Sequence, residues 1–263
     1  VGTSWWTDSM YLPALKNHPQ AEVVAICGRD GERARAMAAQ WAIPNVYTDY
    51  QAMIEQAGLD ALIVASGNDS HYPITMAALQ AGLHVLCEKP LGLTYGEARQ
   101  MADFADAHNL ITMTPFTYRF MPTNRYLKEL VEAGYIGKPY HLNLRYYTGF
   151  GRTNEYRWRF DQSKSGSGVL GDIGTHFLYL ASWWFGEIVE VSCVTNRTIE
   201  RAPAPNGKPY KQTEDTAIIT VLFANGAQGV IHVTCMAYED TPFGQTHHVE
   251  LHGSGGTLYG FID

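Results

Sequence analysis

The stretch ALIVASGNDSHYPITMAALQAGLHVLCEKP, residues 61–90, holds a strand, a helix and a second strand in that order. Residues 61–65 are wholly apolar and have the length of a strand that is covered on both faces. Residues 72–81 predict a helix that Gly82 terminates, and residues 84–87 predict the next strand. This order predicts two parallel strands joined by a helical crossover.

The same alternation of strand and helix extends through the first half of the chain. Thr94 and Glu97 have the spacing of a capping box at the start of a long helix. The further elements that this pattern predicts are strands at residues 22–27 and 111–114 and helices at residues 31–41 and 94–108. We therefore expect an α/β fold that begins with a doubly wound parallel sheet.

The second half changes character, because strand patterns dominate after an expected helix at residues 122–133. Asn225 and Gly226 lie between two of these patterns and indicate a hairpin. The expected strands are residues 139–147, 187–198, 216–223, 227–235 and 246–252, with one helix near residues 172–184. We expect two domains: residues 1–118 with the parallel sheet, and residues 119–263 with an α+β fold on a largely antiparallel open sheet.

Composition excludes several classes of protein. The 263 residues carry a net charge of −7 with scattered basic residues, which disfavours a nucleic-acid partner. No window of eighteen apolar residues occurs, so we expect no membrane span, and the first residues do not resemble a secretion signal. None of the four cysteines belongs to a CxxC pair, so we expect buried, reduced thiols and no metal site. These features predict a cytoplasmic protein.

The opening turn carries the first candidate binding site, because ligands of doubly wound sheets bind beyond the carboxyl ends of the strands. It resembles a dinucleotide-binding turn in which one glycine remains, with Ser4 and Thr7 at the other glycine positions and little strand before it. Its backbone amides are expected to hold a pyrophosphate, the alternative being an ordinary chain terminus. The cofactor-binding residues expected here are Gly2, Thr3, Ser4 and Trp5.

The next strand is followed by Gly28, Arg29 and Asp30. An arginine at this place suits a 2′-phosphate and an acidic residue suits a free ribose, so Arg29 favours NADP and Asp30 keeps NAD possible. Asp30 is also expected to cap the following helix. The other cofactor-binding candidates at strand ends are Ser66, Asn68, His71, Glu88, Lys89 and Pro90. Lys89 is also placed to polarise a substrate oxygen, unless it is an ordinary exposed lysine in a turn.

Residues 166–176, GSGVLGDIGTH, combine close glycines with two groups suited to acid–base chemistry. Asp172 and His176 are four residues apart and are expected to share one helix face. The alternatives are that Asp172 caps the helix and that His176 is a core histidine, and a metal would need a third ligand that this spacing does not supply. The further side chains expected to line a substrate site are Tyr118, Arg119, Tyr147, Trp158 and Arg159.

Together these segments resemble the Gfo/Idh/MocA family of glucose–fructose oxidoreductase and inositol dehydrogenase relatives. The resemblance covers essentially the whole chain, and its most specific feature is EKP at residues 88–90 with GDIGTH at residues 171–176. The other matching segments are LPALKNHPQAEVVAICGRD, SGNDSH, HVLCEKPLGLT, YRFMP, YIGKPYH and GVLGDIGTHFLYLASWWFG. The resemblance implies a Rossmann domain, a second domain with a large open sheet, and NAD or NADP as cofactor.

The resemblance also implies roles for single residues. Lys89 would polarise the reacting hydroxyl or carbonyl beside the nicotinamide, His176 would be the general acid and base, and Asp172 would bind the substrate and assist His176. Family members usually form a homodimer or homotetramer through the open sheet. They also usually continue beyond GTLYGFID, where this chain ends, so we expect the second domain to be C-terminally incomplete.

The expected function is hydride transfer between a nicotinamide cofactor and a sugar, polyol or related alcohol or carbonyl compound. One alternative is an NAD-dependent glycosidase of the same family, which would show no net turnover of cofactor. A second alternative is a non-catalytic regulator that senses a dinucleotide. The presence of Lys89, Asp172 and His176 together disfavours the regulator.

Overall fold

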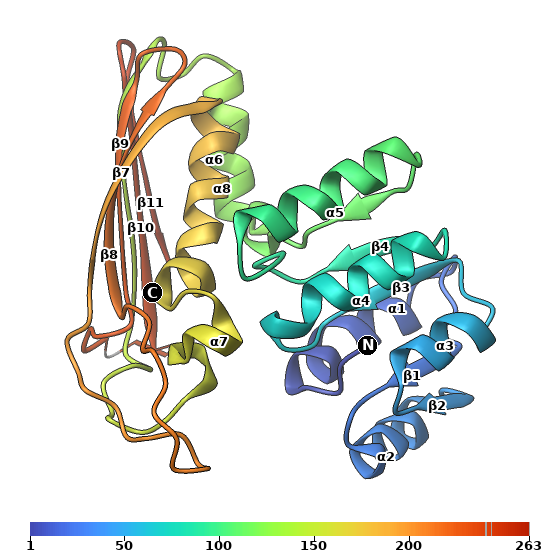
Figure 1. Ribbon diagram of the computed structural model, residues 1–263. Helices are drawn as coiled ribbons and strands as arrows, with labels where there is room; N and C mark the ends of the chain where they lie inside the picture. The colour runs from blue at the N-terminus through green and yellow to red at the C-terminus, as the bar shows by residue number, and fades with distance from the viewer. Residues whose placement is uncertain (240, 243, 263) are drawn as a thin grey trace. The chain divides into compact units, whose positions relative to one another are not determined.

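The computed structural model describes residues 1–239, 241–242 and 244–262, and they form two compact units (Figure 1). The first unit is Val1–Pro115 and the second is Phe116–Asp263. Each unit has its own buried hydrophobic core, as a domain requires.

Parallel strands form the centre of the first unit. Strand β1 (Ala25–Cys27) pairs with β2 (Asn45–Tyr47), and β3 (Ala61–Val64) is followed in the sheet by β4 (His84–Cys87) and β5 (Thr112–Met113). All of these pairs are parallel, so the doubly wound parallel arrangement predicted from the sequence is confirmed.

Val1 and Gly2 bridge the two groups of strands. The Gly2 amide donates a hydrogen bond of 2.9 Å to the carbonyl oxygen of Cys27 at the end of β1. The Ala65 amide, just beyond β3, donates to the carbonyl oxygen of Val1 at 2.8 Å. These two residues lie between β1 and β3, in the place of a central strand. The turn that follows them therefore starts at the carboxyl ends of β1 and β3.

The helices of the first unit begin at side-chain caps in three cases. Asp30 accepts from the amides of Glu32 and Arg33, Asp49 caps α3, and Thr94 forms the predicted capping box with Glu97. The helices are α1 (Leu12–Lys16) after a π-helical turn (Thr7–Tyr11), α2 (Gly31–Trp41), α3 (Tyr50–Gln56), α4 (Asn68–Gln80) and α5 (Tyr95–Ala107). Helix α4 begins four residues before the predicted start, and the sequence analysis did not predict α1 and α3.

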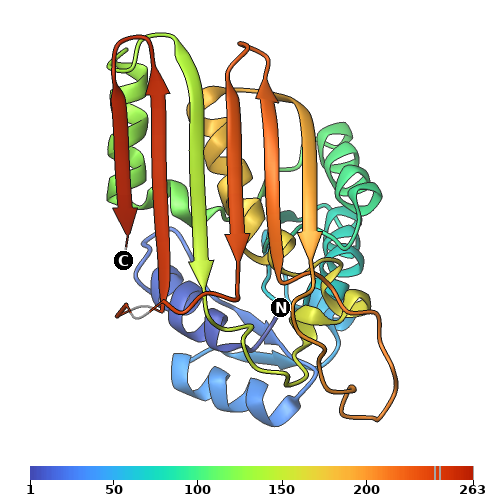
Figure 2. The same ribbon diagram turned by 90° about the vertical axis from the view of Figure 1, so that its left-hand side faces the viewer.

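Six strands form the sheet of the second unit (Figure 2). They are β6 (Pro139–Thr148), β7 (Ile188–Asn196), β8 (Thr216–Phe223), β9 (Gln228–Thr234), β10 (Gln245–Gly253) and β11 (Thr257–Ile262), in the order β11-β10-β6-β9-β8-β7. Only β6 and β9 pair in parallel, so the prediction of a largely antiparallel sheet is confirmed. The predicted hairpin joins β8 to β9, with Gly226 at φ 86°.

Helices α6 (Pro122–Glu132) and α8 (Thr175–Phe185) cover one face of this sheet (Figure 1). A π-helical turn (Leu170–Gly174) leads directly into α8, and two short helical segments, η3 (Trp158–Phe160) and α7 (Gln162–Ser165), precede it. The core between helices and sheet contains the fully buried side chains of Phe160, Phe177, Leu142, Leu144, Ile219 and Ile231. A further short helical turn, η2 (Thr117–Phe120), opens the unit.

The cysteines are all free, but they do not share one environment. Cys27, Cys87 and Cys235 are buried, whereas Cys193 is exposed on β7, which corrects the expectation that all four are buried. Within the described residues, His, Cys, Asp and Glu form no cluster of three or more that could hold a metal ion. None of the helices in that part of the chain is both long and apolar enough to cross a membrane.

Candidate functional site

The opening turn of the first unit requires a glycine at position 2. Gly2 has φ 116°, and an added Cβ atom there would collide with the carbonyl oxygen of Ala65. A Cβ atom on Gly28 would lie 2.6 Å from the side chain of Thr3, so a larger residue there would require Thr3 to move. The Ser4 hydroxyl accepts from the Thr7 amide at 3.4 Å at the start of the helical segment, and Trp5 is exposed. This close backbone turn before a helix start fits the pyrophosphate of a dinucleotide.

Glu88 connects this turn to Lys89. One carboxylate oxygen, Oε1, accepts from the indole nitrogen of Trp6 and from the hydroxyl of Tyr11, both at 2.6 Å. The other oxygen accepts from the Lys89 amide at 3.1 Å. Burial, reinforced by the Glu88 carboxylate, raises the pKa of Tyr11, so its hydroxyl keeps the proton that it donates. The buried carboxylate of Glu88 is thus held by protein donors on both of its oxygens.

His71 joins two segments at strand ends. It is buried, and its ring nitrogens lie 2.8 Å from the carbonyl oxygen of Pro90 and 3.2 Å from that of Ser66. The Ser66 hydroxyl lies 2.7 Å from the hydroxyl of Ser70, and Asn68 is the first residue of α4. His71 therefore holds the loop after β3 against the loop after β4.

At the end of β1, Arg29 and Asp30 differ in whether their side chains are already used in contacts within the protein. The Asp30 carboxylate accepts from the amides of Glu32 and Arg33 at 3.1 Å, as a helix cap does. Arg29 is exposed, and Gly28 before it has no side chain. Arg29 is therefore the charged side chain at this strand end that is not used as a cap.

Glu214 caps the helical segment that carries the two acid–base candidates of the second unit. Its carboxylate Oε1 accepts from the amides of Gly168 and Leu170 at 2.8 and 3.0 Å. Asp172 lies in the π-helical turn that follows, and the buried His176 lies in the first turn of α8. Glu214 therefore supplies the cap at the start of this helical segment. A π-helical turn of this kind is often found at functional sites.

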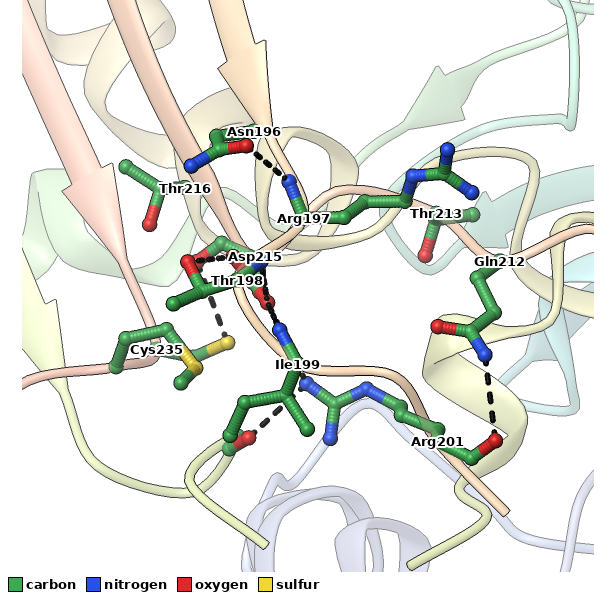
Figure 3. Close-up of polar contacts among 12 residues, drawn as sticks. Asn196, Arg197, Thr198, Ile199, Arg201, Gln212, Thr213, Asp215, Thr216 and Cys235 are labelled. Carbon is green, nitrogen blue, oxygen red and sulfur yellow. Dashed lines mark hydrogen bonds and ion pairs between the residues drawn. The ribbon is translucent and has the colours of Figure 1, made fainter. Parts of the chain in front are cut away.

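The segment that contains Glu214 is anchored by its neighbour Asp215 (Figure 3). The Asp215 carboxylate accepts from the amide and hydroxyl of Thr198 at 2.8 and 3.0 Å and lies 3.8 Å from the guanidinium of Arg201. Both charged side chains are 2% exposed. Arg201 also donates to the carbonyl oxygens of Thr153 and Gly151, so its charge is compensated on several sides.

Aromatic side chains surround His176. The ring of Tyr118 stacks on the imidazole with centroids 4.2 Å apart and an interplanar angle of 20°, and Phe116 meets it edge-on. The hydroxyls of Tyr118 and Tyr146 lie 2.7 Å apart, and Tyr146 donates to the side-chain oxygen of Gln245 at 2.7 Å. His176 thus belongs to a polar and aromatic cluster, not to a purely apolar core.

Arg159 and Trp158 belong to the same neighbourhood as Asp172. The Arg159 guanidinium donates to the Asp172 carboxylate at 3.1 Å and lies over the Trp158 ring at 4.7 Å. The Asp172 side chain is 22% exposed, so it remains accessible to a ligand. Within the second unit, the predicted residues thus form two sets of contacts: Tyr118 with His176, and Arg159 with Asp172 and Trp158.

Two expected substrate residues lie elsewhere. Tyr147 bonds to His232 at 2.7 Å on the face of the sheet opposite to Tyr146, because successive residues of a strand point to opposite faces. This corrects the expectation that Tyr147 lines the site. Arg119 donates to the hydroxyl of Tyr179 at 2.6 Å and lies among aromatic rings, so its guanidinium is held against α8.

Several residues of these sites were not identified from the sequence. In the first unit they are Trp6 and Tyr11, and in the second unit they are Glu214, Tyr146 and Gln245 together with His247. His247 is buried against Tyr118, Tyr146 and Phe177, and among the described residues its Nε2 atom has no hydrogen-bond partner. Burial lowers the pKa of His247 to about 4. The alternation of β6 after Leu142 and Leu144 could have selected Tyr146 in place of Tyr147.

The two units define a class of protein: a doubly wound unit with a dinucleotide-type turn, followed by an open-sheet unit with a histidine and a carboxylate on one helical segment. Residues 1–116 match the oxidoreductase family with an NAD-binding Rossmann fold, and residues 124–259 match the GFO/IDH/MocA C-terminal domain. The chain therefore belongs to the GFO/IDH/MocA family.

Similar proteins include named dehydrogenases. Levoglucosan dehydrogenase of Pseudarthrobacter phenanthrenivorans is 30% identical over 94% of this chain and 65% of its own length. Myo-inositol 2-dehydrogenase of Thermotoga maritima is 28% identical over 95% of this chain and 71% of its own length. The crystal structure of an oxidoreductase domain protein from Kribbella flavida has a TM-score of 0.89 at 32% identity, covering 97% of this chain and 70% of that one.

A levoglucosan dehydrogenase structure in complex with NADH and levoglucosan is also similar. Its TM-score is 0.86 at 29% identity, covering 94% of this chain and 67% of that chain. The chain thus spans about two thirds of the length of these relatives.

Proposed function

We propose that the protein is an NAD(P)-dependent dehydrogenase or reductase that acts on a CH–OH group of a sugar, a polyol or a related compound. The observation that carries the proposal is the arrangement around His176: a buried imidazole stacked on Tyr118, near an accessible carboxylate that Arg159 orients. The family match and the resemblance to structures with bound NADH support the redox class.

The proposed chemistry divides the work among three residues. His176 takes the proton from the substrate hydroxyl, and Asp172 accepts a hydrogen bond from the substrate. In the first unit, the proposed role of the Lys89 ammonium is to donate to a substrate oxygen and to stabilise the negative charge that develops on it. A nicotinamide cofactor bound to the protein would supply the hydride acceptor, or the hydride donor in the reverse direction. The opening turn and the loops after β3 and β4 would hold the cofactor.

We propose NADP, in preference to NAD, as the cofactor on the basis of two charged side chains at the end of β1. Asp30 is used as a helix cap, whereas Arg29 is exposed at the same strand end and can pair with a 2′-phosphate. Arg29→Ala is expected to raise the Kd for NADP about tenfold and to leave that for NAD nearly unchanged. Arg35→Ala, an exposed arginine on α2, is the control. Equal effects on both cofactors would contradict the preference.

The proposed function is tested by a screen of sugars and polyols with NAD and with NADP, followed by absorbance of the reduced cofactor. Lys89→Ala and His176→Ala are each expected to lower kcat at least about 100-fold, with little change in cofactor affinity. Lys16→Ala and His18→Gln serve as exposed controls. Sugar cleavage without net reduced cofactor would show a glycosidase instead, and cofactor binding without turnover of any sugar would show a regulator.

The outer face of the open sheet supports a homodimer or homotetramer as the proposed assembly. This face carries exposed apolar side chains on four strands: Val194, Ile218, Val230, Tyr259 and Phe261. A second copy of the chain would cover them. Val230→Glu is expected to shift the mass measured by light scattering toward the monomer.

Three buried free thiols fit a reducing compartment, so we propose the cytoplasm as the location of the protein.

A further inference from the structure

The hydrogen bonds behind His176 have a definite direction. A phenol hydroxyl has one proton, and Tyr146 donates its proton to the side-chain oxygen of Gln245 at 2.7 Å. The bond of 2.7 Å between the Tyr118 and Tyr146 hydroxyls must therefore use the proton of Tyr118. As a result, the Tyr118 oxygen has lone pairs left but no proton to offer to a ligand.

The surroundings keep this direction fixed. Burial raises the pKa of Tyr118 and of Tyr146, so both hydroxyls stay protonated through the neutral range. His247 packs against both rings and is uncharged at neutral pH because burial lowers its pKa. Asp172 is the nearby negative charge that opposes ionisation of either phenol.

We infer that Tyr118 is a specificity-determining residue that accepts a hydrogen bond from a second hydroxyl of the substrate, next to the one that His176 deprotonates. The inference rests on the proposed function and deepens it. The Tyr118 ring lies face to face with the His176 imidazole, with centroids 4.2 Å apart, so the two side chains are direct neighbours in the second unit. A substrate with a fluorine or a carbonyl at the second position offers no proton and is disfavoured, because its acceptor faces the lone pairs of Tyr118.

The inference is tested by comparing kcat/KM for polyols and sugars with that for their monofluorodeoxy analogues, for example D-glucose with 2-deoxy-2-fluoro-D-glucose and myo-inositol with its monofluoro derivatives. Wild type is expected to favour the hydroxyl compound about tenfold at one carbon position. Tyr118→Phe removes the acceptor and is expected to reduce that ratio to near unity. Tyr146→Phe and Gln245→Leu release the Tyr118 proton for donation and are expected to lower the ratio similarly.

A conservative variant and a matched control complete the test. Gln245→Glu keeps an acceptor for Tyr146, so it is expected to retain the wild-type ratio. Tyr140→Phe alters an exposed tyrosine on the same strand as Tyr146 and is expected to change nothing. Equal ratios in wild type, Tyr118→Phe and Tyr146→Phe, with turnover intact, would overturn the inference alone. Failure of wild type to oxidise or reduce any polyol would overturn the proposed function and the inference with it.

Discussion

The indole nitrogen of Trp6 donates to the Oε1 atom of Glu88 at 2.6 Å, although the two residues lie 82 positions apart in sequence. The same oxygen accepts from Tyr11, and the other carboxylate oxygen accepts from the Lys89 amide. The helical segment after the opening turn and the loop that carries Lys89 are thus joined through one buried carboxylate. A change at Glu88 should therefore affect both stability and cofactor binding.

Glu88→Ala is expected to lower the free energy of unfolding by about 2–4 kcal/mol, because two partly buried donors, Trp6 and Tyr11, lose a charged acceptor. The KM for the cofactor is expected to rise, since the opening turn loses its link to the loop after β4. Chemical denaturation and steady-state kinetics measure the two effects. Tyr11→Phe removes one of the hydrogen bonds to Glu88 and should lower the free energy of unfolding by about 1 kcal/mol. A Glu88→Ala protein with the wild-type unfolding midpoint would show that these bonds contribute no net stability.

Arg159→Ala is expected to reduce kcat/KM about tenfold with less than about 1 kcal/mol of lost stability. The reason is that its ion pair with Asp172 is partly exposed, and such pairs orient side chains more than they stabilise the fold. Arg157→Ala is the matched control, because Arg157 forms a similar exposed pair with Glu155 at 3.7 Å. Equal kinetics in the two variants would argue against an orienting role for Arg159.

Most of the fold could be predicted from local pattern, because hydrophobic period and capping residues act within a few positions. The apolar run at residues 61–65 and the box of Thr94 and Glu97 are examples. The parallel pairing of β6 with β9 could not be predicted in this way, since it joins strands about ninety residues apart. The role of Val1 and Gly2 between β1 and β3 was also missed, because two residues carry no periodic signal.

The residues of the candidate site were likewise predictable only where they lie close together in the sequence. Asp172 and His176 are four residues apart, so their spacing was readable on one helix. Glu214 and Gln245 reach their partners across 44 to 99 residues, and nothing in their own neighbourhoods indicates a role. Tyr147 was chosen, although Tyr146 is the member of the pair that contacts Tyr118, since the aromatic pair was not assigned a register on the strand.

Glu214→Ala is expected to lower the free energy of unfolding by about 1–3 kcal/mol and to reduce kcat. The amides of Gly168 and Leu170 lose their acceptor, and the start of the helical segment with Asp172 and His176 loosens. Glu214→Gln keeps one acceptor oxygen and should recover most of both losses. Glu200→Ala, an exposed glutamate of the same long loop, is the control. Loss of stability without loss of kcat would restrict Glu214 to a purely structural role.

Acid destabilisation should report on His247. Burial lowers the pKa of this imidazole from an ordinary value of 6.5 to about 4, so the unfolded chain takes up a proton at a higher pH than the folded chain. Its contribution to stability is complete above pH 6.5 and is lost as the pH falls toward 4, by at most about 3 kcal/mol. In His247→Phe, the slope of unfolding free energy against pH between 6.5 and 5 is expected to flatten, whereas His18→Gln, at an exposed site, should keep the wild-type slope. The slope is the decisive quantity, because the substitution also alters packing against Tyr118 and Tyr146 at every pH. An unchanged slope in His247→Phe would mean that the folded protein already binds the proton at position 247, and that the cluster behind His176 is charged at mildly acidic pH.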